Sequence, residues 1–130
     1  MTVAVASFDN PEVMQVPQGG GLTLFVCTGV ALTNYAGNSG GWRRDDLVFL
    51  VPEESAGGNP PALTIPNFHD SVVTVTPATF ENNNVADVGW GIDSADSIVV
   101  GNNIQVTARI VVKGNGAQLL RVAYHVLILG

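Results

Sequence analysis

Few side chains in this sequence could act as a nucleophile, a base or a metal ligand. Ser39 lies in a glycine-rich string, and the two histidines, His69 and His125, both follow it in the chain. A serine nucleophile needs a histidine that accepts its proton and a carboxylate that orients the histidine. The spacing of these residues gives no reason for them to meet. We therefore expect no catalytic residue and a protein that is not an enzyme.

The side chains that a metal ion would need occur in two separated groups, His69-Asp70 and the segment Asp93-Ser94-Ala95-Asp96. A metal site takes three or four converging ligands, and this spacing does not bring the two groups together. Asp and Ser also bond to their own backbone in tight turns, so residues 93–96 are interpreted as a turn. The sequence predicts no metal and no cofactor.

The string Gly37-Asn38-Ser39-Gly40-Gly41 resembles the Gly-Asp-Ser-Gly-Gly motif around the serine of trypsin-like proteases, with Asn38 in place of the aspartate. The chain is too short for the double barrel of that family. Its histidines follow the serine, whereas in that family the histidine comes first. A hydrolase acting through Ser39 is the least favoured interpretation, and a plain glycine-rich loop is preferred.

Composition narrows the class of protein further. The chain has 130 residues, which is one domain, and five Lys+Arg against eleven Asp+Glu give a net charge of −6. Nucleic-acid affinity comes mostly from clustered cations, so we expect no nucleic-acid partner. No apolar run approaches the 18 residues of a membrane span, so the sequence predicts no such span and we expect no membrane partner. The one cysteine, Cys27, lies in an apolar run and is expected to be a small buried hydrophobe.

Glycine, proline and asparagine interrupt the chain about every ten residues, between short runs rich in Val, Ile, Leu and Thr. This rhythm predicts an all-β fold, an antiparallel β-sandwich with jelly-roll topology and about eight to ten strands. The expected strands are 2–8, 12–16, 21–32, 46–51, 62–66, 71–76, 85–91, 97–101, 103–113 and 118–129.

The last two expected strands have the clearest pattern. Even-numbered positions in 104–112 and 120–128 are apolar and alternate with mostly polar ones, so each set occupies one face. Parity of the register favours a hairpin with a five-residue loop, 114–118. Leu119, Leu127 and Leu129 then share the outer face with Arg121, and we interpret this face as a subunit contact.

Residues 33–45 are expected to form a long Gly/Asn-rich loop, and residues 52–61 a second loop. The first carries Tyr35 and Trp42-Arg43-Arg44, an aromatic beside two cations that would suit a protein contact. Alternatively, Trp42 covers a core edge while the arginines are solvated. In a lectin-like sandwich, Trp42, Tyr35 and Trp90 would stack on a sugar ring, although Trp90 lies in a strand-like context that favours core packing.

Two segments resemble strands of small β-sandwich proteins from tailed-bacteriophage virions. Residues 45–52, Asp-Asp-Leu-Val-Phe-Leu-Val-Pro, are similar to Gly-Asp-x-Val-x-Val-x-Pro, with Asp45 where the pattern has Gly. After a long insertion, residues 92–100, Ile-Asp-Ser-Ala-Asp-Ser-Ile-Val-Val, are similar to the later strand Ala-Asp-Thr-Val-x-Val, with Ala95-Asp96 at the start of the motif. The resemblance implies a capsid decoration (cement) protein that is oligomeric, commonly trimeric, and bound to the major capsid or another virion protein.

This resemblance sets the remaining expectations. The protein would be made in the host cytoplasm, which fits an N-terminus without a basic signal region, and would end in the virion. Residues 1–20, with Pro11, Pro17 and Gly19-Gly20-Gly21, would form an extended N-terminal arm that lies on a partner. The family has no catalytic residues to transfer. The alternative function is carbohydrate binding by the 33–45 segment.

Overall fold

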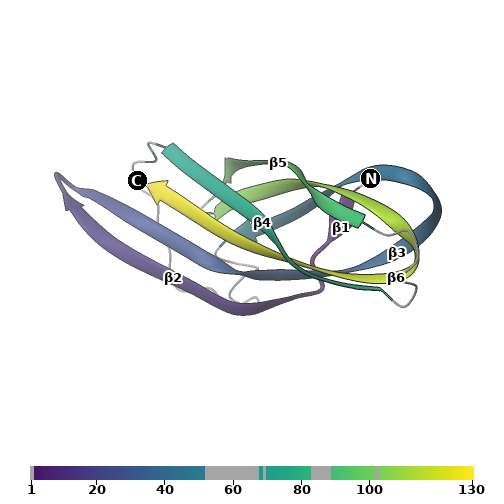
Figure 1. Ribbon diagram of the computed structural model, residues 1–130. Helices are drawn as coiled ribbons and strands as arrows, with labels where there is room; N and C mark the ends of the chain where they lie inside the picture. The colour runs from purple at the N-terminus through teal and green to yellow at the C-terminus, as the bar shows by residue number, and fades with distance from the viewer. Residues whose placement is uncertain (1, 52–67, 69, 83–88, 102) are drawn as a thin grey trace.

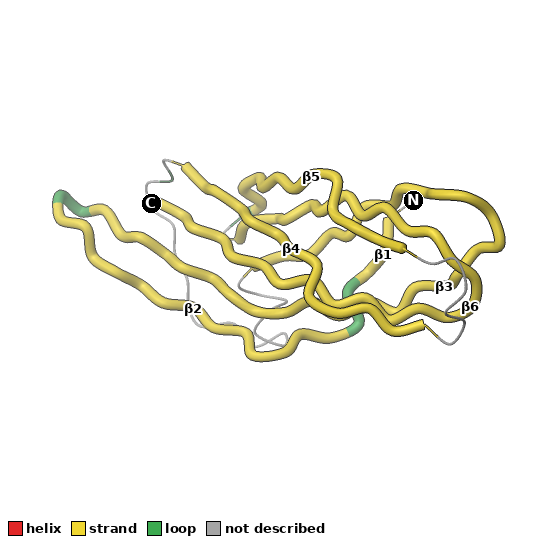
Figure 2. Tube along the Cα trace, viewed as in Figure 1, coloured by secondary structure: helices red, strands yellow, loops and turns green. Residues whose placement is uncertain are grey.

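A computed structural model describes residues 2–51, 68, 70–82, 89–101 and 103–130, and every element in these ranges is a β-strand. This confirms the predicted all-β class (Figures 1 and 2). These ranges contain no helix that is long and apolar enough to cross a membrane. The strands are β1 (Thr2–Ala4), β2 (Ser7–Gly19), β3 (Leu22–Val51), β4 (Asp70–Asn82), β5 (Gly89–Val100) and β6 (Asn103–Leu129).

Two long bent strands, β3 and β6, organise the molecule. Residues 24–36 of β3 pair with residues 129–117 of β6, and residues 43–51 pair with 112–104. The register shifts between these two blocks, where β3 and β6 bend together from one layer into the other (Figure 1). The result is one hydrogen-bonded sheet folded into two antiparallel layers, which is the predicted sandwich.

The shorter strands complete each layer. Layer 1 is built on the first arm of β3 (residues 24–36) and the second arm of β6 (residues 117–129). In this layer, β2 pairs with the β3 arm, and β4 pairs with the β6 arm. Layer 2 is built on the second arm of β3 (residues 43–51) and the first arm of β6 (residues 104–112). Here β1 pairs in parallel with the β3 arm, and β5 pairs with the β6 arm. Each layer therefore has a β3 arm and a β6 arm at its centre and a shorter strand at each edge.

The predicted hairpin within residues 103–129 is wrong. Strand β6 runs without a break from Asn103 to Leu129, and its two arms pair with β3 rather than with each other. Register parity favours a hairpin only if the two alternating strands lie side by side. The same alternation is also satisfied when the two arms lie in opposite layers and their apolar faces meet across the core.

Two other local predictions are also wrong. Residues 33–45 are not a loop but part of β3, and the glycines of this segment coincide with the register shifts at which the strand bends. Residues 93–96 are not a turn but part of β5, with a register shift at Asp93. The expected strand 62–66, most of the expected strand 85–91 and the loop 52–61 lie outside the described residues.

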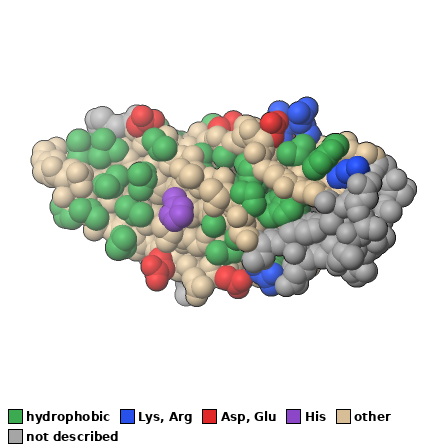
Figure 3. Space-filling model, viewed as in Figure 1, with side chains coloured by type: hydrophobic (Ala, Val, Ile, Leu, Met, Phe, Trp, Pro, Cys, Tyr) green, Lys and Arg blue, Asp and Glu red, His purple; other side chains and the backbone are tan. Residues whose placement is uncertain are grey.

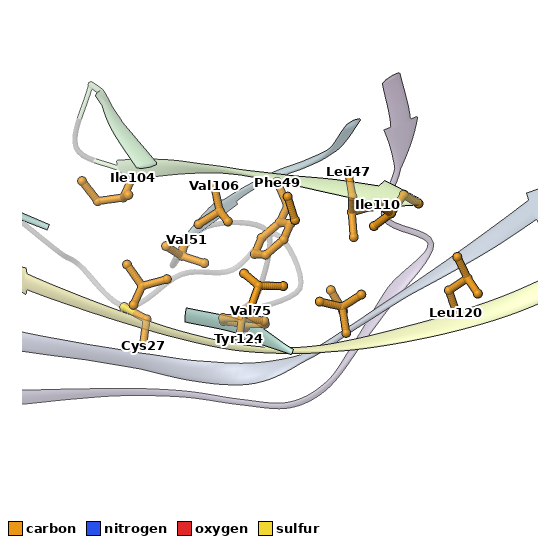
Figure 4. Close-up of a cluster of buried hydrophobic side chains, with 14 of the residues drawn as sticks. Cys27, Leu47, Phe49, Val51, Val75, Ile104, Val106, Ile110, Leu120 and Tyr124 are labelled. Carbon is orange, nitrogen blue, oxygen red and sulfur yellow. The ribbon is translucent and has the colours of Figure 1, made fainter. Parts of the chain in front are cut away.

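The core lies between the layers. The even-numbered positions from Ile104 to Val112 and from Leu120 to Ile128 are all buried, as the alternation predicts. Figure 4 shows the side chains of Ile104, Val106 and Ile110 above those of the opposite layer. Phe49 of layer 2 contacts Tyr124 of layer 1 with a centroid separation of 5.1 Å. Phe8 of β2 adds edge contacts to both rings, which joins the layers through aromatic packing.

Residues 2–4 and 7–19, most of the expected N-terminal arm, are the strands β1 and β2 and pair with β3 of the same chain. The link between them is held by Ala6, whose N–H donates to the Leu32 carbonyl at 2.8 Å. Val13 packs against the core, while most other β2 side chains are exposed. The segment therefore forms one edge of layer 1.

Candidate binding surfaces

The outer face of layer 1 carries a continuous group of apolar side chains. Leu127 of β6 lies between Val26 of β3 and Val72 of β4, and Met14 of β2 pairs with Val26. In the next row, Leu129 pairs with Leu24, and Leu24 pairs with Val16. We call these residues the apolar face: Met14, Val16, Leu24, Val26, Val72, Leu127 and Leu129. The face crosses all four strands of layer 1.

The apolar face is open to solvent. Val72 is 57% exposed, Met14 56%, and Leu127 and Val16 42% each. Figure 3 shows hydrophobic side chains gathered over this end of the molecule, beside the histidine. Scattered surface aliphatics are ordinary, but a contiguous group of this kind usually marks a contact.

A shallow groove of about 210 Å³ lies within the apolar face, lined by Leu24, Asp70, Ser71, Val72, Leu127 and Leu129. Its polar groups already have partners. Asp70 Oδ1 accepts the Ser71 N–H at 2.8 Å, and the Ser71 hydroxyl bonds to the Ser97 hydroxyl at 2.5 Å. The groove surface is therefore mostly hydrocarbon, with the exposed carboxylate of Asp70 in its lining.

Polar residues border the apolar face. His125 lies outward between Thr28 and Thr74 in the neighbouring row, as expected from the alternation. Farther along β6, Arg121 lies 4.0 Å from the carboxylate of Asp9. The seven residues of the apolar face include no charged side chain, so the charges of this layer lie at its margins.

The outer face of layer 2 is different. Its central position holds Arg109, whose Nε donates to Asp46 at 3.2 Å. The neighbouring outward positions include Gln105, Thr107 and Asp96. The outer face of layer 2 also carries aliphatic side chains, such as Ile98, which is 57% exposed, but there they are interspersed with polar and charged residues.

Trp42 marks a second surface, where β3 bends into layer 2. Its side chain is 61% exposed, and its ring lies against Gly89 of β5, where an added Cβ would be 3.0 Å from the ring. Arg43 pairs with the buried carboxylate of Asp45 at 3.4 Å, and Arg44 pairs with Asp93 at 3.4 Å. The exposed indole is thus accompanied by two ion pairs rather than by two free cations.

The predicted interface residues belong to these two surfaces. Leu127, Leu129 and Arg121 lie on the outer side of layer 1, whereas Arg43 and Arg44 lie in the layer 2 arm of β3, just after Trp42. The backbone of Leu119 pairs with Asn34 and Glu81, but its side chain lies outside the described part. Trp90 packs against the core, which confirms its predicted role.

Sequence reasoning missed five members of the apolar face: Met14, Val16, Leu24, Val26 and Val72. The available signal was weak. In 22–26 and 71–75, apolar residues occupy both faces of the strand, so neither run shows which side is exposed. Only the pairing of β2, β3 and β4 with β6 brings these residues beside Leu127.

The described residues contain no group of three His, Cys, Asp or Glu side chains that could hold a metal ion. His69 lies outside this part of the chain. A scan of the sequence against protein-family models found no matching family, and searches of curated proteins and of solved structures found no similar protein.

Proposed function

We propose that this chain is a non-enzymatic structural protein of a phage virion, which self-associates and binds a capsid lattice in a decoration role. The observation that carries the proposal is the apolar face, a four-stranded exposed surface on a sheet that is rigidly packed on its other side. Such a surface suits permanent contact with other proteins. We include in the proposal a jelly-roll topology for the sandwich, since jelly rolls are used by both capsid and lectin domains.

The two segments that resemble virion proteins support this proposal by their positions. Asp46 of the first segment and Asp96 of the second lie in layer 2, on either side of the first β6 arm. There, Asp46 pairs with Arg109 and Asp96 with Thr107. The two segments that resemble virion proteins thus lie in the same layer, as they would if both derived from one strand arrangement shared with those proteins.

We assign the lattice contact to the surface around Trp42, Arg43 and Arg44. An exposed tryptophan buries much area at little cost in side-chain entropy, which makes it a frequent anchor of interfaces. Arg43 and Arg44, which follow Trp42 in the chain, form ion pairs with Asp45 and Asp93 and add charged groups beside the indole. This assignment leaves the apolar face for self-association.

Co-sedimentation tests the proposed function, with empty shells of the major capsid protein encoded by the same genome. The wild-type chain should pellet with the shells at a saturating, fixed ratio. Trp42→Ala should lower the affinity by about tenfold or more. Phe68→Ala is the matched control, because Phe68 is also an exposed aromatic, at 40%. No pelleting of the wild type, or a genome without a capsid gene, would overturn the proposal.

Carbohydrate binding is a second candidate, favoured by the same exposed indole of Trp42, which could stack on a sugar ring. The experiment is a glycan array probed with wild type and Trp42→Ala. Binding that disappears in Trp42→Ala would favour this candidate over the virion role. An empty array, or hits that survive the substitution, would remove it.

A further inference from the structure

We infer that the apolar face binds the apolar face of a second copy of this chain, so that two sandwiches stack through layer 1 about a twofold axis. This inference rests on the proposed function, because it specifies how self-association occurs. It is carried by four properties of the described residues: the charge, the shape and the size of the apolar face, and the state of the sheet edges.

Charge favours a second copy as the occupant. Each chain carries a net charge of −6, so most ways of joining two copies bring acidic surfaces together. The seven residues of the apolar face carry no charge. The adjoining row holds Glu12, Thr28, His125 and Thr74, and Asp70 lies beside Leu129 on β4. The two nearby carboxylates, Glu12 and Asp70, lie on the edge strands β2 and β4, so identical acidic chains can meet here with their like charges at the margins of the contact rather than at its centre.

Shape also favours a second copy. An isologous contact needs a surface that is complementary to itself. The apolar face has a groove of about 210 Å³ between Leu24, Leu127 and Val72, and a projecting side chain, Met14, which is 56% exposed two strands away. A twofold rotation can place each Met14 toward the groove of the other copy, and an unbranched methionine adapts to such a hollow.

The size of the surface fits the centre of an interface. Seven partly exposed aliphatic side chains present on the order of 400 Å², within the range of the largest patches on monomers, which are often functional. A stable contact buries about 800 Å² on each partner. The row of Glu12, Thr28, His125 and Thr74 would supply part of the polar rim that surrounds such a centre.

The strand edges point to stacking rather than to strand addition. Strand β2 carries Pro11 and Pro17 and has register shifts at both of these places. Strand β4 has a shift at Pro77, β5 has one at Asp93, and β1 is three residues long. Prolines, bulges and short strands are the usual protections of a sheet edge against pairing with another chain. The apolar face has no comparable protection.

The test is the mass in solution, by light scattering across a concentration series, of wild type, Val72→Lys and Ile98→Lys. Val72 and Ile98 are each 57% exposed aliphatics on edge strands, but they belong to different layers. Wild type and Ile98→Lys should form dimers of twice 13.5 kDa. Val72→Lys should be a folded monomer, with a dimer Kd raised on the order of a hundredfold.

Oxidation of Met14 by dilute peroxide gives an independent readout. In the wild-type dimer Met14 should be protected, and in Val72→Lys it should be oxidised rapidly. A wild-type monomer, a trimer, or a dimer that Val72→Lys leaves intact would overturn the inference. A dimer that fails to pellet with capsid shells keeps the inference and ends the proposed function. A wild-type monomer that does pellet with capsid shells would overturn the inference and leave the lattice-binding role in place.

Discussion

At the scale of single residues, Gly29 makes room for the largest buried side chain of layer 1. Gly29 pairs with Tyr124, and a Cβ built on Gly29 would lie 2.5 Å from the tyrosine hydroxyl oxygen and 2.8 Å from the ring carbon that bears it. The same ring contacts Phe49 and Phe8. The tyrosine therefore cannot move away without disturbing the contact between the layers.

Gly29→Ala should lower the free energy of unfolding by about 2 kcal/mol, because a methyl group must displace a packed ring. Chemical denaturation gives the measurement. Gly91→Ala is the matched control, since Gly91 is also a strand glycine but has no atom within 4 Å of the added Cβ. It should change stability by less than about 0.5 kcal/mol. Equal stabilities of the two variants would contradict the packing account.

Cys27 is fully buried, as the sequence predicts, and this burial raises the pKa of its thiol from the ordinary 9.0 to about 11. The neutral thiol is a poor nucleophile. Native protein at pH 8 should therefore not react with a thiol reagent, whereas the denatured protein should react fully. Rapid labelling of the native protein would show that this part of the core opens easily.

The same shift predicts a stability change at high pH. The unfolded thiol ionises near pH 9, whereas the folded one stays neutral up to about 11. The contribution of Cys27 is fully present below pH 9 and is lost as pH rises to about 11, by about 3 kcal/mol. Cys27→Ala, compared with wild type across this window, should lack this loss. Parallel pH curves for the two proteins would argue against the shift.

At the scale of strands, alternation in β6 is the strongest determinant of the fold. Val122 is buried and faces the core, while its neighbour Ala123 lies on the outer side between Val30 and Thr76. The two positions differ by one residue in sequence and have opposite environments. The alternation in β6 thus determines which of its side chains face the core and which lie on the outer side of layer 1.

Val122→Asp should destabilise the fold by more than about 3 kcal/mol, because an unpaired carboxylate would be buried in the core. Ala123→Asp introduces the same charge on the outer side and should leave a folded protein. Soluble yield and thermal unfolding by circular dichroism distinguish them. If both variants folded equally well, β6 would not have the orientation described.

At the scale of the whole molecule, contacts across the core and at the margin join the layers. Phe49 bridges to Tyr124, and the hydroxyls of Ser71 in β4 and Ser97 in β5 meet at 2.5 Å. These contacts link segments that are hydrogen-bonded in different layers. The sandwich is therefore expected to unfold as a single unit.

Phe49→Ala should cost about 3–5 kcal/mol, the range for emptying a buried phenylalanine site. Phe68→Ala provides the matched comparison, because Phe68 is 40% exposed whereas Phe49 is 1% exposed. Calorimetry should show a single transition for both variants, with a much lower Tm for Phe49→Ala. Two separate transitions would mean that the layers unfold independently.

The sequence by itself determined the all-β class and the inner faces of the strands. Ile104 to Val112 and Leu120 to Ile128 are buried where their alternation predicts, and Cys27 and Trp90 pack as expected. These features could be predicted because the period of two is a local property of a strand. Burial of one face follows from it whatever the partner strands are.

Only the tertiary structure decided which strands pair and which side chains share the outer face. The residues 114–118 and 33–45 were expected as loops, yet both belong to strands that bend together and cross between layers. Alternation does not distinguish two strands that lie side by side from two that face each other. For the same reason Leu127 was identified from the sequence, but Met14 and Val72 were not. Their contact depends on long-range pairing through β3 and β6, which no local pattern specifies.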